Sequence, residues 1–291
     1  MGKTAIITPI YATQDNRRLD LFQRTLASVH KLSDNFSHIT VDDGSSLSSG
    51  VQEICNRFAG DKRFSYLHRK RNNNDRFTAS NAINAGINHV FSNPQYSDID
   101  HLAFLHSDDE IISLEERTKP LSKNTGATIA DMVLVTNRKE KLQRGQQVIP
   151  QEWIAQGRAA GIPYHTIIWQ REFVSLMLNY NLNKGIEGLF LPALAFAEDR
   201  AAWKLTVLLS AKENLKIGYT PILSVKKHRQ PYSVTGNTSY REWLLDTEVV
   251  EKTYYESKPL LQDRRLVRRL YILAGFHRNP AMHSLLAGFL R

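Results

Sequence analysis

Paired aspartates at two distant points of the chain are the residues best suited to chemistry. Asp42-Asp43 precedes Gly44-Ser45, and Asp108-Asp109 follows the apolar run 102–105. Adjacent carboxylates can hold Mg²⁺ or Mn²⁺, which prefer oxygen ligands, and a single carboxylate can accept hydrogen bonds from a base or a ribose. For each pair the alternative is a solvated acidic turn after a strand.

A third acidic pair, Glu198-Asp199, opens a segment whose helical periodicity continues to Leu208. A carboxylate in this position can act as a general base that takes a proton from a hydroxyl group. The alternative is that the pair complements the positive end of a helix dipole.

The elements that must position these carboxylates alternate along the first half of the chain. Short apolar runs predict strands, whereas apolar residues at helical spacing predict helices. The predicted strands are 5–9, 38–41, 64–67, 102–105 and 132–135, and the predicted helices lie near 19–29 and 76–91. This alternation is typical of an α/β domain with a mainly parallel sheet. It weakens after about residue 150, which indicates an added region.

Two of the acidic pairs come directly after predicted strands. In an open α/β sheet, ligands bind beyond the carboxyl ends of the strands. We therefore expect Asp42-Asp43 and Asp108-Asp109 to reach the same crevice.

Taken in order, these segments resemble family 2 of the GT-A glycosyltransferases over roughly residues 4 to 235. Six motifs carry the resemblance: Ile6 to Tyr11, Val41 to Ser45, Ala82 to Ile87, Ser107 to Asp109, Glu198-Asp199 with Trp203, and Lys227 to Arg229 followed by Ser233 to Thr235. Each motif is weak alone, and their order and spacing make the case.

The resemblance implies an α/β GT-A fold, a Rossmann-like arrangement with a mainly parallel central sheet. The catalytic domain would span 1–235, with a donor half at 1–110 and an acceptor half at 111–235. Residues 236–291 would form a basic, amphipathic helical extension.

The resemblance also implies which residues meet the nucleotide-sugar donor. Pro9 and Tyr11 would line the base, and Asp43 would bind the base or the ribose. Asp108 would contact the ribose and the metal region. Either Arg71 or Arg76 would meet the donor phosphates.

For the reaction itself, the resemblance implies Asp199 as the catalytic base and Asp109 as the principal ligand of Mn²⁺ or Mg²⁺. His228 would sit near the pyrophosphate or complete the metal shell. Glu198 and Trp169 would lie on the acceptor side. One displacement at the anomeric carbon would invert its configuration.

Two positions depart from the family pattern. His106 stands where the family often has an acidic residue, which places more of the metal binding on Asp109. Ile83 stands where an arginine is familiar, so the helix that carries it is better interpreted as a packed core helix.

Charge and composition bear on partners and location. The formal net charge of +9 suggests anionic partners. Arginines at 264–269 line one side of a predicted amphipathic helix, which would either lie on an anionic membrane surface or dock on the catalytic domain. A single cysteine, no signal-peptide pattern and no apolar run of membrane-spanning length predict a cytoplasmic protein, with peripheral membrane association as an option.

These observations predict transfer of a sugar from a nucleotide-sugar, UDP-sugar by default, to a glycan or lipid-linked glycan in bacterial surface polysaccharide assembly. A nucleotidyltransferase and an inactive nucleotide-sugar-binding module are the alternatives. Nucleic-acid binding is not expected, because the basic residues accompany no zinc-ligand spacing, RNP-like motif or helix-turn-helix.

Overall fold

The structure is a computed structural model in which most of the first 228 residues are described. The described residues are 2–13, 18–32, 35–71, 79–136, 139–144, 163–192, 194, 198–228, 246, 249–250 and 253–254.

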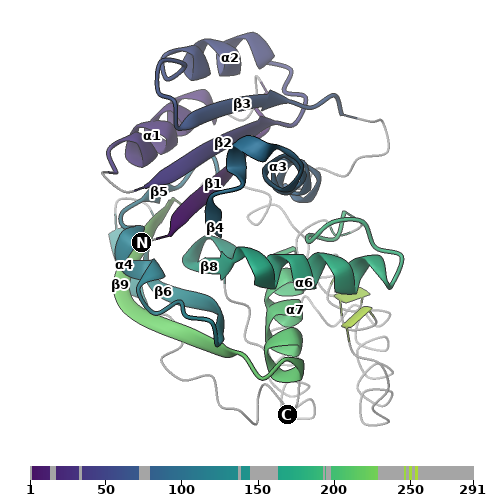
Figure 1. Cartoon of the computed structure of the whole chain (residues 1–291). Coiled ribbons are helices and arrows are strands. Elements are labelled where there is room, and N and C mark those ends of the chain that lie inside the picture. Colours follow the sequence, from purple (N-terminus) through teal and green to yellow (C-terminus); the bar gives the residue numbers. More distant parts are fainter. Residues whose placement is uncertain are drawn as a thin grey trace, which may run out of the picture.

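The first part of the chain alternates strands and helices as the sequence predicts (Figure 1). In order, its elements are β1 (Lys3–Ile10), α1 (Arg18–His30), β2 (Phe36–Asp42), α2 (Ser48–Asn56), β3 (Phe64–His68), α3 (Ser80–Ser92), the 3₁₀ turn η1 (Pro94–Tyr96) and β4 (Ile99–Phe104).

The second part adds longer strands and two longer helices. In order, its elements are β5 (Glu110–Ile111), α4 (Glu115–Thr118), β6 (Thr125–Thr136), β7 (Lys139–Gln143), the 3₁₀ turn η2 (Tyr164–Thr166), β8 (Ile167–Gln170), α6 (Arg171–Leu182), α7 (Glu198–Lys212) and β9 (Lys216–His228).

Among the described residues these strands form one nine-stranded sheet. Its order is β3-β2-β1-β4-β8-β6-β9-β5, and β7 pairs with β6. The pairs of β1 with β2, β1 with β4, β2 with β3 and β6 with β9 are parallel. Strand β8 runs antiparallel to both of its neighbours, β4 and β6. Strand β5 is antiparallel to β9, and β7 is antiparallel to β6. The predicted α/β fold is confirmed, and its sheet is mixed rather than purely parallel.

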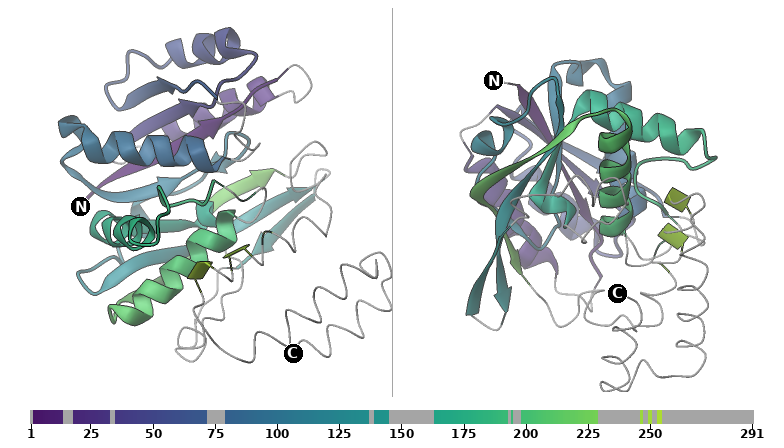
Figure 2. Two further views of the ribbon diagram at one scale, coloured as in Figure 1. Left: turned by 90° about the vertical axis from the view of Figure 1, so that its right-hand side faces the viewer. Right: turned by 90° about the horizontal axis from the view of Figure 1, so that it is seen from below.

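The two faces of the sheet bury different helices because successive side chains of a strand point to opposite sides. In β1, Ile7 packs into a cluster that includes apolar residues of α3, α6 and α7. Its neighbour Ile6 packs into the cluster that includes Val29 of α1 and Ile111 of β5. Figure 2 shows α6 and α7 on the same side of the sheet.

Helix α3 lies close against β1 and β2, as its predicted apolar stripe indicates. Ala82, Ile83, Ile87 and Val90 are fully buried. A side chain at Gly86 would place its Cβ 2.5 Å from Cγ2 of Ile7, so only glycine permits this approach. The interpretation of α3 as a packed core helix is confirmed.

The predicted C-terminal extension, 236–291, lies almost entirely outside the described residues, as does its amphipathic segment at 264–274. Among the helices that the structure describes, none combines the length and the apolar character needed to cross a bilayer.

Candidate active site

The carboxyl ends of β2 and β4 flank the end of β1. Asp43 follows β2, and Asp108-Asp109 follows β4. The backbone N–H of Asp43 donates to the carbonyl of Ile10 at 2.8 Å, which ties the first acidic pair to the last residue of β1. Because β2 and β4 both pair with β1, the two acidic pairs are separated by about 10 Å, two strand spacings. The carboxyl ends of the strands are the edge at which an open α/β sheet binds its ligands.

Asp42 closes the turn after β2 and is fully buried. Its Oδ1 accepts from the backbone N–H of Ser45 at 2.9 Å, and its Oδ2 accepts from the hydroxyl of Tyr66 at 3.0 Å. Gly44 has φ +70°, in the left-handed region that favours glycine. Asp42 therefore holds the loop, whereas the carboxylate of Asp43 pairs with arginine side chains.

Asp43 lies among cationic and aromatic side chains. It forms an ion pair with Arg69, and its Oδ2 lies 3.7 Å from Nη1 of Arg71. The guanidinium of Arg71 stacks over the ring of Tyr11, 4.6 Å from its centroid. Sequence reasoning missed Arg69, although the basic run 69–71 directly follows the strand that neighbours β2.

The other two predicted donor residues are placed differently. Pro9 lies buried within β1, in register with Val41 of β2. Arg76 lies outside the described residues.

Asp109 is 1 % exposed, and only one of its two carboxylate oxygens has a hydrogen-bond partner among the described residues. Its Oδ1 accepts from the backbone N–H of His228 at 3.0 Å, whereas its Oδ2 has no hydrogen-bond partner among the described residues. Burial, and then the charge of Asp108, raises the pKa of the Asp109 carboxyl well above its usual value; Asp199 adds to this, and Lys227 opposes it.

Two histidines face Asp109. One potential ligand atom from each of His106, Asp109 and His165 lies within 4.8 Å of the other two, and this is the cluster of metal-ligating side chains that the described residues contain. The imidazole of His228 instead contacts Oε1 of Glu110 at 2.7 Å. The sequence analysis marked His106 as a departure from the family pattern and assigned no role to His165.

Asp199 lies in the first turn of α7, and its Oδ1 accepts from the backbone N–H of Tyr164 at 3.5 Å. Burial raises the pKa of Asp199 to about 6, although the charge of Lys227 and the Tyr164 N–H both act to lower it. Tyr164 contacts Asp199 while the next residue, His165, faces Asp109. The turn η2 therefore links the two carboxylates.

Comparison with known proteins identifies the family. The family model for glycosyl transferase family 2 matches residues 5–183, more than half of the chain. The chain belongs to this family. It is therefore a glycosyltransferase, and the matched range contains both acidic strand ends and η2.

Solved structures show the same fold. Residues 1–349 of S. aureus TarS in complex with UDP-GlcNAc are 14% identical with a TM-score of 0.61, over 96% of this chain and 74% of that one. A mannosyltransferase from Pyrobaculum calidifontis in complex with GDP-Man and Mn²⁺ is 13% identical with a TM-score of 0.51, over 98% and 79%. Both are GT-A glycosyltransferases, and at this identity the likeness concerns the fold. A search of curated proteins found no match.

Trp169 and Glu198 are the two residues of this glycosyltransferase that were predicted to lie on the acceptor side. Trp169 is fully buried in β8, where its indole N–H donates to Oγ1 of Thr206 at 2.9 Å. It belongs to the core between the sheet and α7, so the expectation that it meets an acceptor is wrong. Glu198 begins α7, but its side chain lies outside the described residues.

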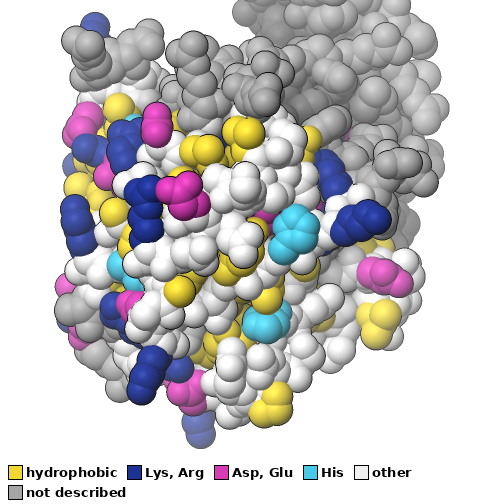
Figure 3. All heavy atoms as spheres, turned by 90° about the horizontal axis from the view of Figure 1, so that it is seen from above, with side chains coloured by type: hydrophobic (Ala, Val, Ile, Leu, Met, Phe, Trp, Pro, Cys, Tyr) yellow, Lys and Arg dark blue, Asp and Glu magenta, His cyan; other side chains and the backbone are white. Residues whose placement is uncertain are grey.

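The surface charge is mixed where it can be seen. On the face viewed from above, the described lysines and arginines lie interspersed with acidic side chains (Figure 3). On this face the described residues therefore do not gather into the continuous basic surface that binds a nucleic-acid backbone.

Proposed function

We propose that this glycosyltransferase transfers a sugar from a nucleotide-sugar to an acceptor hydroxyl with inversion, with Asp199 as the base and with a cation held at Asp109. The observation that carries the proposal is the convergence of Asp109 and Asp199 from segments 90 residues apart in the sequence. Asp109 is buried and Asp199 is half-buried, the turn η2 contacts both, and Asp199 is among the charges that raise the pKa of Asp109.

Asp199 has the properties that a general base needs. Its carboxyl sits at the start of a helix, and its pKa of about 6 lies closer to neutrality than that of an ordinary aspartate. A base is most effective when its pKa approaches the working pH. Ionised Asp199 would take the proton of the acceptor hydroxyl as the oxygen attacks the anomeric carbon.

Asp109 and its histidine neighbours fit a divalent cation, because a buried carboxylate oxygen without a partner faces them. When bound, such a cation neutralises the negative charge that develops on a departing diphosphate. Asp108, which directly precedes Asp109 in the chain, would orient the ribose or the water molecules bound to the cation.

The other end of the crevice suits the nucleotide. Asp43 would accept hydrogen bonds from the base or ribose, and Tyr11 would offer a ring face. Arg69 and Arg71, which surround Asp43, would hold the phosphates or keep this carboxylate in place.

The substrate classes are proposed in part by analogy. TarS was solved with UDP-GlcNAc, and the Pyrobaculum mannosyltransferase with GDP-Man and Mn²⁺. We propose a UDP-sugar donor, Mn²⁺ or Mg²⁺, and a glycan or lipid-linked glycan acceptor in bacterial surface polysaccharide assembly. The basic segment at 264–269 supports a cytoplasmic enzyme that associates peripherally with an anionic membrane, and the split into donor half, acceptor half and extension remains part of the proposal.

A donor panel tests the proposal. Tag-free protein is titrated with UDP-, GDP- and dTDP-sugars with Mn²⁺ by calorimetry, and turnover is then measured as release of the nucleotide diphosphate. Asp199→Asn should lower turnover by about 10²- to 10⁴-fold, the range that a general base contributes, because it cannot take a proton. Its affinity for the donor should stay within about threefold of wild type, because the amide keeps the shape of the side chain.

Asp98→Asn is the matched control, since Asp98 is exposed and paired with Lys3 far from the crevice. It should keep wild-type turnover. Full turnover in Asp199→Asn would remove this residue from the base role, and a protein that binds donors but never turns them over would be a binding module.

A further inference from the structure

The site around Asp109 contains two unpaired atoms that face each other. Oδ2 of Asp109 and Nδ1 of His165 have no hydrogen-bond partner among the described residues, and both residues are 1 % exposed. Leaving one such buried polar atom unpaired costs about 1–3 kcal/mol. The two atoms lie 3.9 Å apart, too far for a hydrogen bond between them.

The tautomer of His165 follows from its other contact. Nε2 of His165 lies 3.4 Å from Sδ of Met132. A thioether sulfur can only accept a hydrogen bond, so Nε2 carries the hydrogen and Nδ1 presents a lone pair. A nitrogen atom with a lone pair and a carboxylate oxygen therefore lie 3.9 Å apart, each without a hydrogen-bond partner among the described residues. A cation between them would satisfy both.

His106 completes the set from a third direction. Its Nδ1 contacts the hydroxyl of Tyr164 at 3.1 Å, which leaves Nε2 free to act as a ligand. Hydrogen bonds of this kind fix the ring orientation of metal-binding histidines. The carbonyl of His165 accepts from Nη2 of buried Arg117 at 3.3 Å, which holds η2 in place from behind.

The spacing fits one ion. The three ligand atoms lie within 4.8 Å of one another, while two ligands on opposite sides of a transition metal lie roughly 4.2 Å apart. A small inward movement of the partly exposed His106 closes the difference. Three protein ligands leave positions for phosphate oxygens and water.

We propose that His106, Asp109 and His165 form a two-imidazole, one-carboxylate site that holds Mn²⁺, Co²⁺ or Zn²⁺ in preference to Mg²⁺. Imidazole nitrogens suit transition metals, whereas Mg²⁺ requires oxygen ligands. The inference deepens the proposed function, in which a cation receives the diphosphate, by naming the ligands and the class of metal.

Electron spin-echo spectroscopy of Mn²⁺ bound to tag-free wild-type protein, without donor, tests the ligand set directly. Bound imidazole should give ¹⁴N modulation, and a hundredfold excess of Mg²⁺ should not displace the Mn²⁺. Absence of ¹⁴N modulation, or displacement by equimolar Mg²⁺, would overturn the proposal. This measurement needs no variant.

Variants give the second test. His106→Gln and His165→Gln should each weaken Mn²⁺ binding by tenfold or more in calorimetry, with circular dichroism to verify folding. His101→Gln is the matched control, because His101 is a buried histidine within β4, the strand after which His106 comes. Unchanged Mn²⁺ affinity in both folded variants would also overturn the site.

The outcome is separable from that of the proposed function. If the protein binds no Mn²⁺ and still transfers sugar in EDTA, the metal-site proposal is wrong and the sugar-transfer proposal stands. If the protein binds Mn²⁺ tightly with ¹⁴N modulation but transfers no sugar, the metal-site proposal stands and the proposed reaction is wrong.

Discussion

At the scale of single residues, Lys227 is the charge that the carboxylates and histidines of the crevice share. It acts to lower the pKa of Asp109 and of Asp199, and it also lowers the pKa of His106 and His165. A positive charge beside a carboxylate favours the ionised form. Lys227 therefore keeps Asp199 closer to the deprotonated state that a base requires.

Replacing Lys227 with methionine should move the acid limb of the rate profile to higher pH. In the proposed mechanism the carboxylate of Asp199 is the active form, so kcat/KM should fall as the pH drops through the pKa of about 6 in the wild type. Without the nearby ammonium the carboxyl is protonated more readily, and the fall should begin at higher pH. The measurement is kcat/KM against pH at saturating Mn²⁺.

Lys226→Met is the control, since the side chain of Lys226 pairs with Glu140 on β7 instead. Its acid limb should coincide with that of the wild type. An acid limb that does not move in Lys227→Met would mean that another group limits the rate at low pH.

At the scale of elements, Asn84 joins α3 to the segment that precedes α7. Its Oδ1 accepts from the backbone N–H groups of Leu189 and Phe190, both at 3.0 Å, and its Nδ2 donates to the carbonyl of Phe190 at 2.7 Å. This segment leads into the helix that carries Asp199. Sequence reasoning treated the motif around Asn84 as core packing and missed this role.

Asn84→Ala should lower the free energy of unfolding by about 2–4 kcal/mol, because it leaves three buried backbone groups without partners. Turnover should fall further than the fraction of folded protein does, because α7 loses its anchor. Urea unfolding and kcat at a temperature where the variant is folded measure the two effects. Asn88→Ala, one turn later on an exposed part of α3, is the control and should change neither.

The sequence predicted the strand ends well and their long-range partners poorly. β1, β2 and β4 are apolar runs, and Asp, Gly or Ser follow closely after β2 and β4, which are local signals. β9 was missed because Pro221 interrupts it, and a proline normally argues against a strand. In the structure the register between β6 and β9 shifts between Thr220 and Leu223, and this irregularity accommodates the proline.

The candidate site likewise contains residues that local motifs predict and residues that only the pairing of distant strands brings in. Asp43, Asp109 and Asp199 were proposed from local motifs, since each follows a strand or lies at the start of a helix. His165 could not be found, because it meets Asp109 only through the pairing of β8 with β4. Trp169 was misplaced for a related reason: an aromatic residue in a short apolar run carries no local sign of whether it faces the core or a substrate.

At the scale of the whole molecule, the fold keeps several histidines neutral. Burial lowers the pKa of each member of one set: His30, His38, His89, His101, His106 and His165. Because the unfolded chain binds these protons more readily, the free energy of unfolding should decrease as the pH falls below about 6.5. This acid sensitivity is spread over both faces of the sheet.

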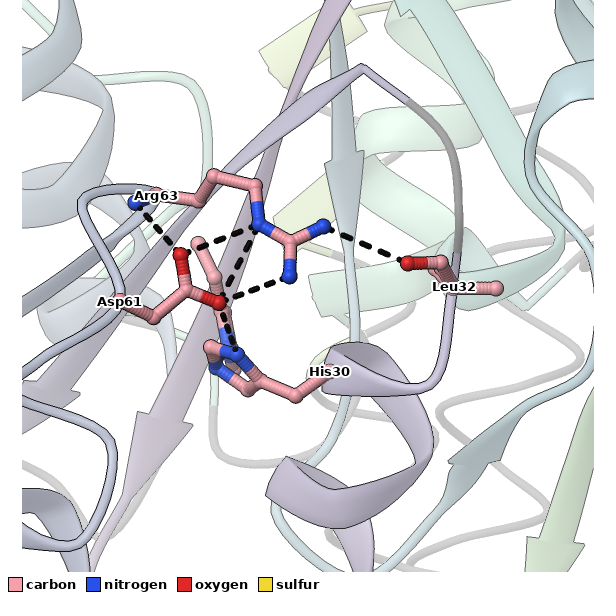
Figure 4. A network of polar contacts seen from close by, with 5 residues as sticks. His30, Leu32, Asp61 and Arg63 are labelled. Carbon is pink, nitrogen blue, oxygen red and sulfur yellow. Dashed lines mark hydrogen bonds and ion pairs between the residues drawn. The ribbon is translucent and has the colours of Figure 1, made fainter.

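One hydrogen-bonded network shows why protonation of a buried histidine is unfavourable. Asp61 bonds to Arg63 and to Nδ1 of His30 at 2.9 Å (Figure 4). Nε2 of His30 lies 3.4 Å from Nδ1 of His38, whose Nε2 contacts Oγ1 of Thr8 at 2.9 Å. A proton on fully buried His38 would bring a charge beside a second imidazole, and burial with that neighbour lowers the pKa of His38 to about 3.

His38→Gln should therefore flatten the dependence of stability on pH. The wild-type contribution of His38 is complete above its unfolded pKa of 6.5 and is lost as the pH falls towards 3, by up to about 1.4 kcal/mol per pH unit. Glutamine keeps a hydrogen bond to Thr8 but takes up no proton, so its unfolding free energy should decline less steeply between pH 6.5 and 4.5. Urea titrations of the wild type and of His38→Gln across this range test it. Equal slopes in wild type and His38→Gln would mean that the acid sensitivity resides in the other buried histidines, those of the cation site included.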